Sequence, residues 1–524
     1  MIRGCNFSLW AALAAVAVAA PAGCRAPALT FPAQPLRADA NAVVYDTDGD
    51  GHGDCFFLLD SAGRAVSLKT ARHGGDGGNE LVVELDKLPI SRCQHVVIIL
   101  DGVGYDLVKD FQQAGHLRMF HPPSRVIAPY PTLTDLCFED FLGLPPVKGM
   151  EAQYYDRRKN EIVGGSGNYL DANELPYNRV LNYRADTLMD ALCYLYPESV
   201  FIKDINDAKR LIDRNLTREV FVYLVSSAGL GTIDGPDGHR QALAGVERLV
   251  SQVLWETDGL CKFTLLSDHG HTYTPAKRIE MEDHLKAKGW NLSDRVKSDR
   301  DVAYVRFGLE TYLSLSGRHP AELAADAVTC PGAELASYAD NGRVVVLDGA
   351  GGRAVIGRKA GRYSYQAASG DPLKLKETLP SLQADADGYY DANEMLAATC
   401  THTYPAGPER LWRAHCEIVE NPPDVIVSLA DDYYSGSRGL GGFVKVASTH
   451  GGLNCRNSTA FIMSTAGPLP PLMRSREIPA NMTGLTGQAW PWRKQAHAGG
   501  ARQAARGTLQ TKPPGFVRIG TCGT

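Results

Sequence analysis

Four short, continuously apolar runs constrain the fold of this chain more than any other feature. They cover residues 95–100, 220–225, 263–266 and 425–429. A run without polar alternation is typical of a strand that is covered on both faces. Between the runs lie stretches with apolar residues at helical spacing, such as 241–254. The alternation predicts an α/β fold with a mostly parallel central sheet that is covered by helices.

The composition agrees with a globular protein of this class. The chain has 524 residues, of which 44% are hydrophobic and 22% are charged, and its net charge is -5. A chain without a broad basic field offers no evident surface for nucleic acid. We therefore expect a partner other than DNA or RNA.

The first 24 residues have the pattern of a targeting segment. Arg3 precedes an apolar stretch at 9–20, which is followed by Pro21-Ala-Gly-Cys24. The segment resembles a bacterial lipoprotein signal with Cys24 as the acylated residue, although Pro21 stands where an aliphatic residue is usual. We expect an exported protein in the periplasm or outer membrane, with a lipid anchor as its link to the membrane, or a secreted one.

A Pro- and Ala-rich tether at 25–40 and a small module at 41–90 are expected to follow. The module contains Asp46, Asp48, Asp50 and Asp54 with glycines between them. Carboxylates at alternate positions let a short loop surround a hard cation, so this loop predicts structural Ca²⁺. The alternative is an acidic turn that binds no ion.

Three further segments have a distinct character. The stretch at about 300–420 is irregular, with a hairpin expected from 343–347 and 353–357, and we interpret it as a cap or insertion. From 485 to 524 the chain has little periodicity and predicts a disordered tail. Cys400 and Cys416 are a candidate disulfide pair if the protein is exported.

Polar side chains with metal-ligand chemistry follow several of the apolar runs. Asp101-Gly follows the first run, Ser-Asp268-His269-Gly follows the third, and Thr134 ends the segment 126–134. His450 comes late in the chain, in Ser-Thr-His-Gly-Gly. Ligands gather beyond the carboxyl ends of strands in open α/β sheets. Two Asp, two His and a hydroxyl are ligands that a pair of zinc ions accepts.

In this order, Val-Val-Ile-Ile-Leu-Asp101-Gly, Pro-Thr-Leu-Thr134, Leu-Ser-Asp268-His269-Gly and Thr-His450-Gly-Gly resemble the four motifs of the nucleotide pyrophosphatase/phosphodiesterase branch of the alkaline phosphatase superfamily. The resemblance implies a three-layer α/β/α sandwich at 91–484. It also implies that Asp101, Thr134, Asp268 and His269 surround one zinc, and that His450 belongs to a second.

Thr134 is the residue that aligns with the nucleophile of the branch, because a helix is expected to follow it directly, whereas Thr132 lies two residues earlier. A metal lowers the pKa of the hydroxyl, and attack then gives a phosphothreonine. The Phe-Pro-Asn that follows in the branch is replaced by Asp135-Leu-Cys137, so the wall of the pocket differs. Gln153 stands near the place of an Asn that binds a phosphoryl oxygen, or is a surface polar residue.

One motif is broken. The branch has Asp-x-x-Gly-His before Gly-Pro, and here Ala228 and Thr232 stand at the Asp and His positions. His450 alone cannot hold zinc, so we expect one firmly bound zinc and a second position that is empty or weak. Four other residues offer ligand atoms, and each is expected to be an exposed polar side chain: Asp234, Asp237, His239 and His271.

Two functions are compatible with this pattern. The first is a phosphodiesterase or phosphatase that acts on a small phosphoester with a degenerate second metal site. The second is a non-catalytic surface lipoprotein of the same fold that binds one metal or a ligand. A sulfatase is disfavoured because Cys137 lacks the Cys-x-Pro-x-Arg context, and a metal-dependent phosphoglycerate mutase because it would be cytoplasmic.

The targeting segment makes a prediction. A radioactive fatty acid is expected to label the expressed wild-type protein and not the Cys24→Ser variant, because the thiol is the acylated group. Equal labelling of both proteins would contradict lipidation at this residue.

Overall fold

The fold is described from a computed structural model, over residues 28–71, 80–165, 175–215, 219–306, 308–436 and 444–491. Cys24 and the targeting segment lie outside the described residues, as does the chain beyond 491. Among the helices of the described ranges, none combines the length and the apolarity that crossing a bilayer requires.

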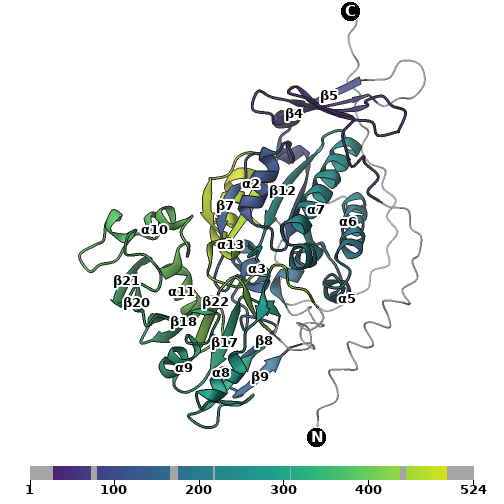
Figure 1. Cartoon of the computed structure of the whole chain (residues 1–524). Coiled ribbons are helices and arrows are strands. Elements are labelled where there is room, and N and C mark those ends of the chain that lie inside the picture. Colours follow the sequence, from purple (N-terminus) through teal and green to yellow (C-terminus); the bar gives the residue numbers. More distant parts are fainter. Residues whose placement is uncertain are drawn as a thin grey trace, which may run out of the picture.

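A seven-stranded sheet forms the centre of the molecule (Figure 1). Only β24 runs antiparallel to its neighbours, and the other six strands are parallel to one another. The strands, in spatial order, are β10 (Tyr183–Arg184), β11 (Glu219–Leu224), β6 (Gln94–Leu100), β12 (Cys261–Ser267), β24 (Thr459–Ser464), β7 (Ser124–Ile127) and β25 (Leu472–Arg474).

Helices cover both faces of this sheet because its strands are apolar on both sides. On β6, Val96 and Ile98 pack toward one group of helices, whereas Val97 and Ile99 pack toward the other. The first group is α2 (Tyr105–Gln113), α6 (Pro197–Arg214) and α7 (Ser226–Glu256), and the second is α3 (Thr134–Leu142) and α14 (Ile478–Thr486). The predicted α/β/α sandwich with a mostly parallel sheet is confirmed.

The assignment of 425–429 to the same pattern is wrong. This strand, β22 (Val425–Leu429), lies in a second, eight-stranded sheet, antiparallel to β17 (Tyr312–Ser316) and β18 (Ala333–Asp340). The second sheet is covered as well, by α8 (Met281–Ala287) and α9 (Pro320–Ala327) on one side and α11 (Gly407–Cys416) on the other. An apolar run indicates a strand that is buried on both faces, but it does not indicate in which sheet the strand lies.

Most of the second sheet comes from the segment interpreted as an insertion, and it lies beside the central sheet in Figure 1. The expected hairpin is present as β19 and β20. The sheet order is β14 (Asn291–Leu292), β15 (Asp301–Val305), β17 (Tyr312–Ser316), β22, β18 (Ala333–Asp340), β19 (Arg343–Asp348), β20 (Arg353–Lys359) and β21 (Arg362–Ser369). Short elements complete this part: β8 (Gln153–Asp156), β9 (Glu161–Gly164), β13 (Lys277–Arg278), β16 (Leu309–Glu310), β23 (Tyr433–Gly436) and α10 (Ala392–Thr399).

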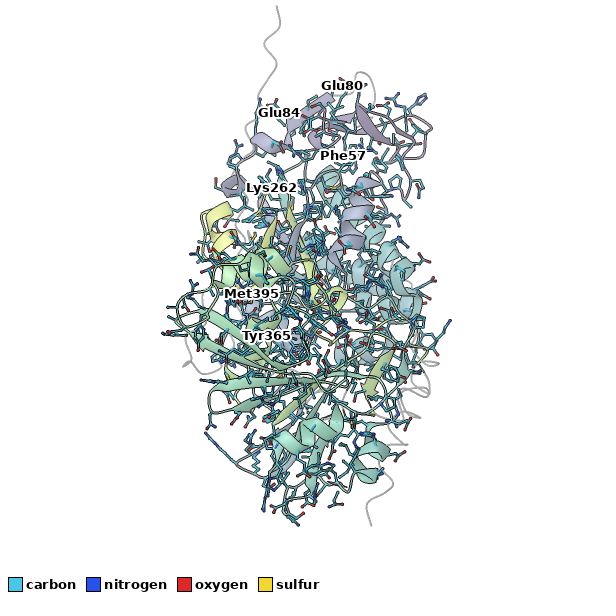
Figure 2. All side chains as sticks on the ribbon, turned by 60° about the vertical axis from the view of Figure 1, so that its left-hand side comes forward. Phe57, Glu80, Glu84, Lys262, Tyr365 and Met395 are labelled. Atoms are coloured by element: carbon cyan, nitrogen blue, oxygen red, sulfur yellow. The ribbon has the colours of Figure 1, made fainter. Side chains whose placement is uncertain are left out.

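An antiparallel five-stranded sheet lies at one end of the molecule, where Figure 2 shows Phe57, Glu80 and Glu84 above Lys262. Lys262 on β12 is buried and donates to the Leu85 carbonyl at 2.6 Å, which ties this sheet to the central one. Its strands are β1 (Arg37–Ala38), β2 (Ala42–Tyr45), β3 (Cys55–Leu59), β4 (Ala65–Ala71) and β5 (Glu80–Glu84).

The interpretation of 25–40 as a tether is wrong for its described part. Leu29 and Phe31 are buried in the core, because both side chains are large and apolar. The backbone N–H groups of Ala28 and Leu29 donate to the side chain of Asn206 at 2.6 and 2.9 Å. Residues 28–31 are therefore packed against α6 and α7, and residues 37–38 form the edge strand of the N-terminal sheet.

The start of the tail at 485 is also too early. Residues 485–486 end α14, and Trp490 is buried with its indole N–H donating to the Phe141 carbonyl at 2.9 Å. The candidate disulfide between Cys400 and Cys416 is not formed, since both are free thiols in the structure.

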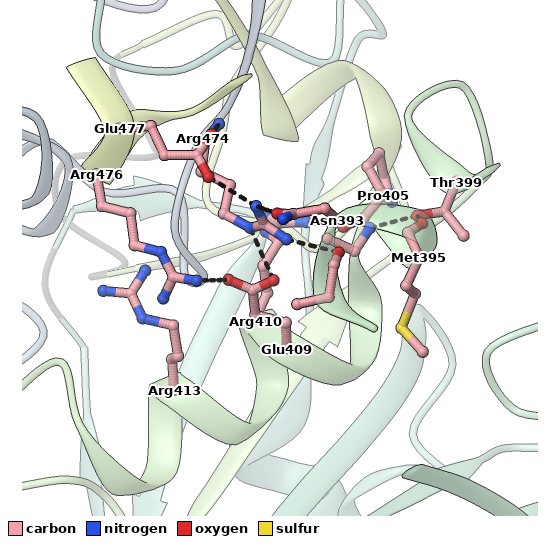
Figure 3. A network of polar contacts seen from close by, with 12 residues as sticks. Asn393, Met395, Thr399, Pro405, Glu409, Arg410, Arg413, Arg474, Arg476 and Glu477 are labelled. Carbon is pink, nitrogen blue, oxygen red and sulfur yellow. Dashed lines mark hydrogen bonds and ion pairs between the residues drawn. The ribbon is translucent and has the colours of Figure 1, made fainter. Parts of the chain in front are cut away.

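A buried ion network joins the insertion to the central sheet (Figure 3). Glu409 on α11 accepts from Arg474 Nε at 2.8 Å and from Arg476 at 2.5 Å. Arg474 ends β25, and it also donates to the Ala392 carbonyl and the Asn393 side chain at 2.6 and 2.8 Å. Charges buried in this way are tolerated only when they are paired and hydrogen-bonded.

Removing the charge of Glu409 is therefore expected to destabilise the fold. Glu409→Gln removes the buried carboxylate that Arg474 and Arg476 share and leaves Arg474 only the more exposed Glu477 as a counter-charge, which should lower the free energy of unfolding by about 3 kcal/mol. The matched control is Glu417→Gln, whose carboxylate pairs with Arg413 from a side chain that is 40% exposed, and which should cost less than about 1 kcal/mol. Urea denaturation measures both changes, and equal losses would contradict a structural role for the network.

Candidate metal centre

The central sheet brings two aspartates together at the carboxyl ends of adjacent strands. In the parallel pair β6 and β12, Leu100 lies opposite Ser267. The next residues, Asp101 and Asp268, therefore leave the sheet side by side, and both are buried. This register is the local reason for the carboxylate pair that the motifs predicted.

His269 and Thr134 complete a first group around these carboxylates. Asp101, Asp268 and His269 each offer one ligand atom, and these atoms lie within 4.8 Å of one another. His269 Nε2 is 3.4 Å from Asp268 Oδ2 and 3.8 Å from Asp101 Oδ1. Thr134, the first residue of α3, directs its hydroxyl at Asp101 Oδ2 at 3.5 Å. The four residues expected at one metal are thus brought together.

The hydrogen bonds of this group leave one acceptor free on each ligand. Asp268 Oδ1 accepts from the N–H groups of Gly102 and His269 at 3.0 and 2.8 Å. Asp101 Oδ2 accepts from the Tyr223 hydroxyl. In contrast, Asp101 Oδ1, Asp268 Oδ2 and His269 Nε2 are buried and have no hydrogen-bond partner among the described residues. Buried acceptors without a donor that converge on one point fit a bound cation.

The electrostatics of the carboxylates point the same way. Burial, and next the charge of Asp268, raise the pKa of Asp101 to about 7. Burial raises the pKa of Asp268 to about 7 as well. Both shifts show that the protein groups alone do not neutralise this pair, and a nearby divalent cation reverses such shifts.

The two threonines of the second motif have different surroundings. Thr132 is buried, its hydroxyl accepts from Gly451 N at 2.9 Å, and its carbonyl accepts from His450 Nδ1 at 2.9 Å. Thr134 is only half-buried and faces the carboxylates. Thr132 therefore holds the loop of His450, and Thr134 is the hydroxyl that is directed into the centre.

The expectation that His239 and His271 are exposed is wrong, because both side chains are fully buried. His271 lies beside His450, with their ring centroids 5.2 Å apart, and both offer ligand atoms within 4.8 Å of an oxygen of Asp101. His239 lies next to His271, with ring centroids 5.0 Å apart. Their Nε2 atoms also have no hydrogen-bond partner among the described residues.

The broken motif lies where expected, although it offers few ligand atoms. Ala228 and Thr232 are buried in the first part of α7, and the Thr232 carbonyl accepts from Ala447 N at 2.8 Å, close to the loop of His450. Asp234 and Asp237 are exposed, as predicted. Gly235 interrupts the helix with φ of 61°, and this change of direction precedes the buried His239.

Two other predicted sites are placed differently. Gln153 lies on β8, where its Oε1 accepts from Arg306 N at 3.4 Å, and no hydrogen bond within the described ranges joins it to Thr134. In the N-terminal loop, Asp46, Asp48 and Asp50 lie within 4.8 Å of one another. Asp54 is buried and accepts instead from the N–H of Thr47 at 2.9 Å, so it does not join the three.

The sequence contained one signal for the residue that was missed. His271 follows His269 by two residues in Asp268-His-Gly-His, so it belongs to the same loop at the end of β12. The direction of its side chain depends on a second loop, because Thr272 N donates to the Thr449 carbonyl at 2.7 Å. That contact joins segments far apart in the chain and is not readable from local pattern.

Comparisons with known proteins find no match by sequence and distant matches by structure. No family model and no curated protein matches the sequence. The structure is similar to that of an inactive threonine-to-alanine variant of murine ectonucleotide pyrophosphatase/phosphodiesterase 5 in complex with AMP, with 11% identity and a TM-score of 0.40 over 77% of this chain and 97% of that one. The human protein of the same name gives the same identity, TM-score and coverage.

The unmutated murine protein matches with 12% identity and a TM-score of 0.39, again over 77% of this chain and 97% of that chain. At this level of similarity, the matches carry no conclusion about activity or substrate. The chemistry of the centre is argued below from its own residues.

Proposed function

We propose that this chain is a metal-dependent phosphoester hydrolase in which Thr134 is the nucleophile. The observation that carries the proposal is the position of the Thr134 hydroxyl, at the start of a helix and beside buried, unpartnered carboxylate and imidazole atoms. A catalytic nucleophile needs a group that activates it within reach and an open side for substrate. Thr134 and His450 are only half-buried, so they lie on the open side of the centre.

The donor set fits zinc. Asp101, Asp268, His269 and the hydroxyl of Thr134 provide oxygen and nitrogen atoms of the kind that zinc binds in four-coordinate sites. When bound, the metal lowers the pKa of the hydroxyl and neutralises phosphoryl charge. Asp268 is held for this role by two backbone N–H groups, and Asp101 by Tyr223.

The residues of the chain then perform a two-step transfer. The Thr134 hydroxyl gives up its proton to solvent as Oγ1 attacks phosphorus, the bond to the leaving-group oxygen breaks, that oxygen takes up a proton from solvent, and a phosphothreonine forms. Thr134 is the first residue of α3, and the free N–H groups at the start of a helix favour phosphoryl charge. Water then attacks the same phosphorus, the bond to Oγ1 breaks, and phosphate or a phosphomonoester is released with the threonine restored.

The alternative is a non-catalytic lipoprotein, which could bind a metal as well. What distinguishes the two hypotheses is therefore whether the protein has a reactive nucleophile, and not how much metal it binds. A purely structural metal site is closed by its protein ligands. Here a hydroxyl with nucleophilic potential is half-buried at the edge of the centre. This arrangement favours a small phosphoester as substrate, and export with a lipid anchor at Cys24 remains part of the proposal.

Replacing the nucleophile tests the proposal. Thr134→Ala is expected to lower kcat for a chromogenic phosphodiester by about three orders of magnitude or more, because it removes the attacking oxygen. Thr134→Ser is the matched control: it keeps the hydroxyl and should retain measurable turnover and a serine-bound phosphoryl group that mass spectrometry detects. Turnover near the wild-type rate in Thr134→Ala would place the attack elsewhere, and absence of turnover in all three proteins would favour the non-catalytic alternative.

We also propose that the loop of Asp46, Asp48 and Asp50 binds Ca²⁺ in a structural role. Asp46 already orders the loop by accepting from Gly49 N and Gly51 N at 2.7 and 2.8 Å. Three carboxylates in one turn give the oxygen-rich surroundings that Ca²⁺ prefers. Asp54, which pairs with Thr47, is not part of the proposed ligand set.

Calcium removal should lower the melting temperature of the wild type and leave turnover of a small substrate intact, because the loop lies in the N-terminal sheet, remote from Thr134. Asp48→Ala should abolish the calcium-dependent part of the melting temperature in differential scanning calorimetry. Glu80→Ala, at an exposed carboxylate on β5 of the same sheet, is the control and should retain it. A calorimetric titration of the wild type without heat would contradict the site.

A further inference from the structure

We infer that the second metal position is rebuilt in this chain from Asp101, His271 and His450, with His271 in place of the ligands missing at Ala228 and Thr232. The inference deepens the proposed function, on which it rests, and replaces the expectation of an empty or weak second position. It assigns a metal-binding role to a histidine that the motifs do not include.

Distances and burial support this set. One ligand atom from each of the three residues lies within 4.8 Å of the other two. The ring centroids of His271 and His450 are 5.2 Å apart, and the ring planes are inclined by 36°. His271 and Asp101 are buried, whereas His450 is half-buried.

In both His271 and His450, the hydrogen bond is made by Nδ1, which leaves Nε2 available to a metal. His450 Nδ1 lies 2.9 Å from the Thr132 carbonyl, which only accepts, so Nδ1 carries the proton and Nε2 keeps its lone pair. His271 Nδ1 is held by the Ser448 hydroxyl at 3.0 Å, and its Nε2 has no partner in the part of the chain that the structure describes. Metal-binding histidines are typically oriented in this way, by a partner on the other ring nitrogen.

The backbone is shaped to admit His271. Gly102 follows Asp101 directly, and a Cβ atom at this position would lie 2.5 Å from His271 Nε2. Gly102 also has φ of +75°, a conformation that favours glycine. A larger residue would push the imidazole out of the centre, so Gly102 and His271 form a matched pair.

His239 is placed next to this site and not in it. Its ring adjoins His271, and its Nδ1 contacts the Tyr273 hydroxyl at 2.8 Å, but it is outside the set of mutually close ligand atoms. Three protein ligands then leave one coordination position open at the second metal. An open position is typical of catalytic zinc, where water or substrate completes the site.

Metal content tests the inference independently of activity. The full-length protein is loaded with zinc, freed of excess metal and measured by inductively coupled plasma mass spectrometry. The wild type is expected to hold two zinc ions per chain, and His271→Ala and His450→Ala one each. His415→Ala is the matched control, because it removes a buried imidazole that contacts Ser337 in the second sheet, and it should retain two.

Cobalt substitution gives a second readout. The visible absorption of the Co²⁺-loaded wild type should titrate to two equivalents, and that of His271→Ala to one, with circular dichroism confirming that the variant is folded. One equivalent in the wild type, or two in the folded His271→Ala variant, would overturn the inference. If the wild type binds two equivalents of cobalt but turns over no phosphoester, the second metal site is supported and the proposed function is contradicted. If it binds one equivalent and turns over substrate, the proposed function is supported and the second metal site is contradicted.

Discussion

Two parallel strands in register set the chemistry of this protein. β6 and β12 end side by side, so the carboxylates of Asp101 and Asp268 leave the sheet together into a buried space. Burial raises the pKa of both carboxylates to about 7, and the charge of Asp268 adds to the shift of Asp101, so the ionised pair is unfavourable without a cation. The surrounding groups are arranged around this constraint: backbone N–H groups hold Asp268, and Tyr223 holds Asp101.

The second sheet supports the centre through its helix α11. Arg410 on that helix is buried, and it donates to the carbonyls of Pro129 and Leu453 at 3.2 and 3.1 Å. One of these residues precedes Thr134 and the other follows His450, so a single guanidinium holds both loops. The network of Glu409 and Arg474 fixes the same helix to the end of β25. The insertion therefore positions the site and is not merely appended to the central sheet.

The residues of the metal centre differ in how well the sequence predicted their positions. Asp101, Asp268 and His269 follow apolar runs directly, and their convergence needed only the rule that parallel strands end at one edge. The choice of Thr134 over Thr132 rested on the expected start of a helix, and the structure places that start at Thr134. The exposed positions assigned to His239 and His271 were wrong. His271 lies in a loop and His239 on α7, and in both settings the same local sequence allows an imidazole to face solvent or the core.

The sequence by itself determined the α/β class, the two buried strands that carry aspartates and the break at Ala228 and Thr232. These features depend on residues that are close together in the chain, and the local sequence indicates both the spacing of apolar residues and the ends of strands. Only the tertiary structure decided that 425–429 belongs to the second sheet and that His271 faces His450. The physical reason is the same in both cases. Strand partners and loop directions are fixed by contacts between distant segments, such as Thr272 with Thr449, and local pattern carries no record of them.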